Sequence, residues 1–161
     1  MFTLQKIEYG RTNVPEPCLM PLTKDVAVVC GMAMYMDTAA HTLKKATGDC
    51  TVEYIALEDK TAKTAGEKVL CYRVLPQMIF EVPLASYSAS VHVAGAAVQI
   101  HTDGLRLGAA AASGLSATTT AANSAYTTKV SQKTGAVIVD TEGAAAANDK
   151  VLVRLARRRH M

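Results

Sequence analysis

The chain has 161 residues, enough for one ordinary domain or two very small ones, and half of them are hydrophobic. Much of that half is alanine, and with two Phe, six Tyr and no Trp we expect a thin core of Val, Leu, Ile and Met. The net charge of +3 equals the contribution of Arg157, Arg158 and Arg159 near the end of the chain, which argues against a basic face for nucleic acid.

Residues 1–22 are predicted to form an extended N-terminal arm rather than part of a core. Pro15, Pro17 and Pro21 remove backbone donors, which argues against a helix or a central strand. Val14, Leu19 and Met20 supply apolar side chains with which such an arm could dock along the sheet edge of a neighbouring subunit. A disordered leader is the alternative.

Residues 23–85 are predicted to form a first β module of short strands. Apolar or alternating runs occupy residues 26–31, 33–37, 51–59, 68–76 and 77–84. Gly31 and the stretches ATGD and TAGE between these runs are typical of turns. Because no amphipathic helix intervenes, the predicted fold class is mainly β, as a small sandwich or barrel.

Residues 86–156 are predicted to form a second β module that repeats the first. The phrase GMAMYMDT at Gly31 returns as GAAVQIHT at Gly95, and the KVL at Lys68 returns at Lys150. The spacing between equivalent residues grows from 64 to 82, so the second copy carries an insertion of 18 residues. We expect an Ala/Thr-rich loop or extra hairpin at about 109–128, and a solvated basic tail at 157–161. The architecture is thus built from two similar halves, in one barrel or two.

The four cysteines, Cys18, Cys30, Cys50 and Cys71, include no CxxC pair, and no histidine stands at zinc-finger spacing. Cys30 and Cys71 lie in apolar strand-like runs, where we expect buried free thiols. No apolar stretch has the length of a signal peptide or a membrane span. We therefore expect synthesis in a reducing cytoplasm, four reduced cysteines and no membrane partner.

The sequence shows no recognisable constellation of catalytic residues. His41, His92, His101 and His160 share no motif, and His101 takes the place of Asp37 in the repeat, as a polar strand end would. P-loop, nucleophile-elbow and dinucleotide-binding motifs are missing. We therefore expect no enzymatic activity, and no catalytic, cofactor-binding or metal-binding residues.

Three stretches resemble the small capsid decoration (cement) proteins of tailed bacteriophages and prophages: GRTNVPEP, the run from GMAMYMDTAAHTLKKATGD to YRVLPQMIFEVPL, and GAAVQIHTDGLRL. The likeness covers most of residues 8–107 and the final strand at 149–155, and the Ala/Thr-rich insertion departs from it. The resemblance implies a non-enzymatic virion protein on the exterior of an expanded icosahedral capsid. It also implies the major capsid protein as partner and self-association, often as a homotrimer.

On this hypothesis the arm holds the residues that contact the capsid or a neighbouring subunit, namely Arg11, Asn13, Val14, Pro15, Glu16, Pro17, Leu19 and Met20. Deletion of residues 2–17 is then predicted to leave the β core folded with a similar Tm. Two alternatives stay open. One is another virion component, such as a head fibre or a tail-tube module, and the other is a non-enzymatic ligand-binding β module.

Overall fold

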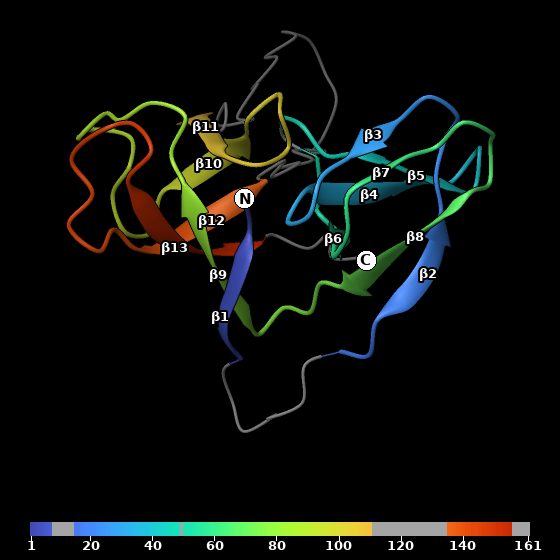
Figure 1. Cartoon of the computed structure of the whole chain (residues 1–161). Helices are drawn as coiled ribbons and strands as arrows, with labels where there is room; N and C mark the ends of the chain where they lie inside the picture. The colour runs from blue at the N-terminus through green and yellow to red at the C-terminus, as the bar shows by residue number, and fades with distance from the viewer. Residues whose placement is uncertain (8–14, 49, 111–134, 156–161) are drawn as a thin grey trace, which may run out of the picture.

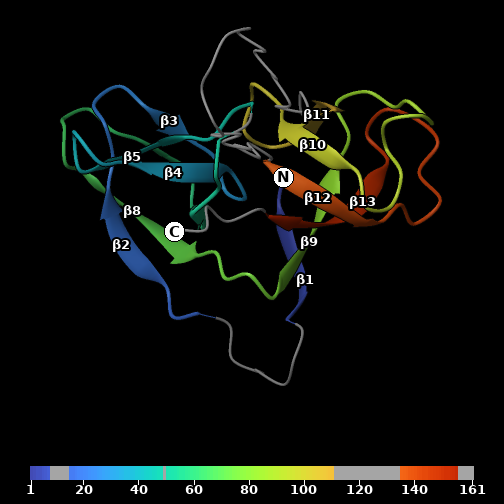
Figure 2. The same ribbon diagram turned by 180° about the vertical axis from the view of Figure 1, so that it is seen from behind.

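The computed structural model describes residues 1–7, 15–48, 50–110 and 135–155. These residues form strands β1 to β13 and no helix, so the mainly β prediction is confirmed (Figure 1). Two large antiparallel sheets lie side by side, with the N-terminus between them (Figures 1 and 2). Most of the predicted insertion at 109–128 and the whole basic tail at 157–161 lie outside the described residues.

The first sheet is built from residues 18–73. Its strands, in order across the sheet, are β2 (Cys18–Pro21), β8 (Lys68–Arg73), β6 (Tyr54–Ala56), β4 (Ala33–Asp37) and β5 (Thr42–Lys45). A separate ladder joins β3 (Ala27–Val28) to β7 (Lys60–Thr61). In β8, Val69 and Cys71 are buried on one face, and Tyr72 is buried on the opposite face in a different apolar cluster, so both faces of this strand carry core residues.

The second sheet combines the N-terminal strand with residues 78–155. Its order is β1 (Thr3–Ile7), β9 (Met78–Pro83), β13 (Lys150–Leu155), β12 (Ala136–Asp140), β10 (Ala97–Ile100) and β11 (Leu107–Ala110). Val151, Val153 and Leu155 of β13 are buried on one face, as the alternating sequence predicts. Among the described residues, neither sheet is closed into a barrel.

Apart from β1, the second sheet repeats the topology of the first. Strands β9, β13, β12, β10 and β11 stand in the order of β2, β8, β6, β4 and β5. The registers agree as well, because Pro21 lies opposite Lys68 in the first sheet and Pro83 lies opposite Lys150 in the second. The sequence repeat therefore corresponds to a repeat of strand order and register.

The glycine that opens both repeated phrases has the same role in each half. Gly31 donates its backbone N–H to the oxygen of Ala56, and Gly95 donates to the oxygen of Ile138, at 2.8 Å in both cases. Their φ angles are 76° and 84°, a left-handed conformation that glycine adopts at little cost. The repeated phrase thus encodes the turn that leads into β4 in one half and β10 in the other.

One apolar core cluster contains residues of both sheets. Tyr72 of β8 stacks on Phe80 of β9, with ring centroids 6.3 Å apart, and Phe2 meets the same ring edge-on at 6.4 Å. Gly48 of the first half also forms an antiparallel bridge with Ile100 of the second. The two halves therefore share buried surface. A second apolar cluster, which includes Leu22, Leu43 and Cys71, lies within the first half.

The predicted boundary between the modules at 85/86 is wrong. Strand β9 pairs with β13 of the second sheet, so the chain passes from one sheet to the other within residues 74–77. Strand β9 is the counterpart of β2, yet their sequences share little beyond the terminal Pro-Leu at Pro21 and Pro83. A short apolar run of this kind is compatible with either sheet, and only the non-local ladder assigns it.

The prediction that residues 1–22 form an arm outside the β core is also wrong for the described residues 1–7 and 15–22. Strand β1 pairs with β9, strand β2 pairs with β8, and Phe2 is buried. Both strands lie at sheet edges, where a strand tolerates proline. The prolines correctly excluded a central strand in this segment, but they are compatible with an edge strand.

The two cysteines expected to be buried differ in their exposure. Cys71 is buried on β8, whereas Cys30 is exposed in the turn before Gly31, where its backbone N–H donates to Asp59 Oδ1 at 2.7 Å. The apolar run at 26–31 ends in this turn, so its last residues leave the sheet. All four cysteines are free.

Candidate functional site

The structure describes five of the eight residues predicted to contact a partner. Arg11, Asn13 and Val14 lie outside the described residues. Glu16, Pro17 and Leu19 are exposed, and Pro15 and Met20 are half-buried. The five described residues occupy the beginning of β2 and the segment that precedes it.

Among the described residues, the outer edge of β2 lacks a strand partner over only a short length. Leu22 donates to the oxygen of Glu67 at 2.8 Å and accepts from Gly66 at 3.0 Å, so its backbone groups face the β8 side. Because backbone groups alternate between the two edges of a strand, those of Leu19 and Pro21 face away from β8. Pro21 has no N–H, and Thr23 beyond it donates to the oxygen of Leu43 of β5. The open stretch therefore centres on Leu19, whose side chain is 58% exposed.

The equivalent edge in the second half is covered. There β1 pairs with β9, with Thr3 opposite Glu81 and Leu4 opposite Phe80. In the internal repeat, Phe80 corresponds to Cys18 and Glu81 to Leu19. Strand β1 therefore lies where the outer edge of β2 at Cys18 and Leu19 has no strand partner among the described residues. No sequence pattern predicts this difference, because residues 3–7 have no counterpart in the repeated phrases.

Two exposed valines occupy equivalent positions in the two halves. Val29 is 43% exposed and Val93 is 45% exposed, and each stands two residues before the shared glycine. Together with Leu19 and Met1 they are the large apolar side chains exposed in the described part of the chain. Scattered exposed apolar residues are ordinary, so an individual valine does not define a site.

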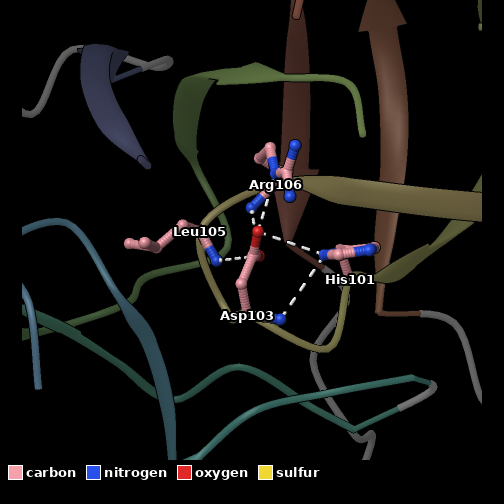
Figure 3. Close-up of polar contacts among 4 residues, drawn as sticks. All are labelled: His101, Asp103, Leu105 and Arg106. Atoms are coloured by element: carbon pink, nitrogen blue, oxygen red, sulfur yellow. Dashed lines mark hydrogen bonds and ion pairs between the residues drawn. The ribbon is translucent and has the colours of Figure 1, made fainter. Parts of the chain in front are cut away.

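The carboxylate of Asp103, in the turn between β10 and β11, has several polar partners (Figure 3). It accepts hydrogen bonds from the backbone N–H of Leu105 at 2.8 Å and from Arg106 Nε at 2.6 Å, and His101 Nδ1 lies 3.1 Å away. Burial raises the pKa of this carboxyl, but the hydrogen bonds from Leu105, Arg106 and His101 outweigh it and bring the pKa to about 2. Asp103 is therefore ionised at neutral pH and engaged within its own turn.

The Asp103 turn joins the two halves. Gly104, at φ 72°, accepts a hydrogen bond from the backbone N–H of Ala33 at 2.8 Å. A Cβ at this position would lie 2.8 Å from Lys45 Cγ, so the turn fits closely against the first half. The carboxylate organises an inter-half contact, which is a structural role of the kind expected for the neighbouring His101.

His92 is buried and has a hydrogen-bond partner at each ring nitrogen. Its Nδ1 accepts from the backbone N–H of Ser88 at 3.0 Å, so Nε2 carries the proton and donates to the oxygen of Gly108 at 3.0 Å. The ring also stacks on Tyr87 at 6.0 Å. Its counterpart in the first half is the buried Val28, and His92 therefore fills a core position while tying a loop to β11.

Within the described ranges, no group of three or more His, Cys, Asp or Glu side chains is arranged to hold a metal ion. The part of the chain that the structure describes also has no helix able to cross a membrane. Comparison with protein-family models, with curated proteins and with solved structures gave no match. What the geometry defines is thus an all-β protein with two similar sheets and an exposed apolar residue on one open sheet edge.

Proposed function

We propose that this protein is a capsid decoration protein of a tailed bacteriophage or prophage. In this proposal it has no enzymatic activity. It binds the major capsid protein on the exterior of the expanded shell, associates as a homotrimer and stabilises the shell in the virion. The sequence resemblance suggests this class, and a β-rich fold agrees with it.

The observation that carries the proposal is the exposed Leu19 side chain on the open edge of β2. An apolar side chain at a sheet edge, beside the exposed Glu16 and Pro17, is suited to burial against another protein. The revised binding surface is this edge, called the β2 edge below and defined as residues 15–20. Attachment would use side chains as well as backbone groups, because Pro15 and Pro17 cannot donate hydrogen bonds.

The proposal includes a barrel-like shape for each half. Leu22 at the end of β2 forms a parallel bridge to Leu43 of β5, and Leu84 after β9 forms the same bridge to Leu107 of β11. In the first sheet this bridge joins the two outer strands at one end, and in the second sheet it joins β11 to the end of β9, the neighbour of the outer strand β1. Curling of this kind presents the β2 edge at the rim of the first half, where a shell surface could reach it.

The test is a binding assay with shells assembled from the major capsid protein encoded in the same genome. Purified full-length protein is mixed with expanded shells and with compact precursor shells, and co-sedimentation is measured. Saturable binding to expanded shells only is expected. Absence of binding to expanded shells would contradict the proposed function, and it would favour a head-fibre, tail-tube or ligand-binding module.

A matched pair of variants tests the β2 edge separately. Leu19→Glu is expected to weaken binding to expanded shells at least tenfold, because it places a charge in an apolar contact. Val93→Glu changes an exposed apolar residue of the other half and is expected to bind as the unmodified protein does. If the Leu19→Glu protein still binds expanded shells, the contact lies on another surface. The proposed function itself would not be contradicted by that result.

A further inference from the structure

Two cysteines that are 53 positions apart in the sequence face each other across a strand pair. Cys18 of β2 and Cys71 of β8 are directly opposite in the antiparallel ladder, and their sulfur atoms lie 3.9 Å apart. Directly opposite residues in such a ladder have Cα atoms about 4.5–5.5 Å apart. Disulfides span Cα separations of about 4.4–6.8 Å, so the backbone already has the required spacing.

The two sulfurs also lie on the same face of the sheet. Cys71 is fully buried in the apolar cluster of the first half, and Cys18 is half-buried against that cluster. The sulfurs need only side-chain rotation to approach the bonding distance of about 2.05 Å. Neither of the other cysteines is paired in this way, since Cys30 is exposed in a turn and Cys50 lies in the segment between β5 and β6.

We propose that Cys18 and Cys71 form a reversible intramolecular disulfide that fastens the edge strand β2 to β8. The oxidant is a low-molecular-weight disulfide such as oxidised glutathione. Both cysteines are oxidised, one S–S bond forms between them, and the small disulfide is reduced to two thiols that receive the two cysteine protons.

The exposure of the two thiols determines the order of the exchange. Burial, together with the neighbouring Cys18, raises the pKa of the Cys71 thiol to about 12, so Cys71 is a poor first nucleophile. The Cys18 sulfur attacks the small disulfide first, which breaks its S–S bond and releases one thiolate. Cys71 then displaces the second small thiol from Cys18, and its proton passes to that leaving group.

The consequence is a first sheet whose edge strand β2 is covalently held to β8, while the side of β2 that faces away from β8 is unchanged. The reaction needs no partner protein, so it does not depend on the proposed function. A thiol pair of this kind remains reduced in a reducing cytoplasm and closes once the protein reaches an oxidising medium.

The experiment uses the full-length Cys30→Ser/Cys50→Ser protein, which keeps only the facing pair. It is incubated with oxidised glutathione, denatured, alkylated without reduction and measured by intact mass and peptide mapping. The expected product is a monomer without alkylated cysteine, lighter by two hydrogens, with linked peptides that contain Cys18 and Cys71. Its Tm is expected to rise by about 5–10 °C, reversibly with dithiothreitol.

The matched control is Cys71→Ser in the same background, which is expected to stop at a glutathione adduct on Cys18 without a rise in Tm. In the test protein, two alkylated cysteines, a stable adduct on Cys18 beside an alkylated Cys71, or a disulfide-linked dimer would each overturn the proposal. The same peptide mapping on the unmodified protein decides the question if the double serine variant does not fold.

Discussion

Tyr72 and Phe80 stack with an angle of 8° between their rings, although one belongs to the first sheet and the other to the second. Phe80 is fully buried, and Phe2 contacts its ring from the N-terminal segment. One aromatic ring thus links the two repeats and the start of the chain. The halves are therefore expected to unfold together rather than as independent units.

Replacement of Phe80 tests this coupling. Phe80→Ala is expected to lower the free energy of unfolding by about 3–5 kcal/mol, because it leaves a cavity between the sheets. Hydrogen exchange should show loss of protection in β8 and β9 together. Leu19→Ala is the control at an exposed site and should change stability by less than about 0.5 kcal/mol. Retained protection in β8 of the Phe80→Ala protein would show that the halves are independent.

The N-terminal strand is expected to stabilise the fold. Because Phe2 is buried and β1 covers the edge of β9, deletion of residues 2–17 should lower the Tm, which reverses the expectation from the sequence. Phe2→Ala alone should cost about 3 kcal/mol in chemical denaturation. Glu16→Ala, at an exposed position, serves as the matched control. A deletion variant with an unchanged Tm would restore the description of this segment as a separate arm.

The two equivalent glycines should respond differently to the same substitution. Gly31→Ala and Gly95→Ala both place a side chain in a left-handed conformation, at a cost of about 1–2 kcal/mol. At Gly31 the new Cβ would also lie 2.7 Å from Met1 Cβ, whereas nothing lies within 4 Å at Gly95. Denaturant titration should find Gly31→Ala less stable than Gly95→Ala by about 1 kcal/mol or more. Equal losses of stability in the two variants would mean that the N-terminal residue shifts away from the new side chain at position 31 without a cost in free energy.

The Asp103 turn should contribute to stability in a pH-dependent way. The pKa of Asp103 is about 2, below the ordinary value of 3.8, so its contribution is complete above about pH 4 and is lost as the pH falls toward 2. Since the group is partly open to solvent, Asp103→Asn should cost about 1 kcal/mol at pH 7 and little at pH 2. Melting curves across this range check the sign. If Asp103→Asn lowers the stability equally at both pH values, the charge of Asp103 does not contribute to the stability.

Much of the architecture follows from local sequence. The alternation of apolar residues in runs such as KVLVRL determined the β class, because side chains of a strand alternate between two faces. The paired phrases at Gly31 and Gly95 determined the internal repeat, since each needs a left-handed residue before a strand.

The tertiary structure alone decided which strands are neighbours. Nothing local places residues 3–7 against β9, assigns β9 to the second sheet, or sets Cys18 opposite Cys71. Ladders are made by backbone groups that nearly every residue carries, so a strand's partner depends on how distant segments bury their apolar faces together. For that reason residues 3–7 and 18–21 of the predicted arm form two edge strands, and the candidate binding surface narrowed to the part of β2 that the described residues leave uncovered.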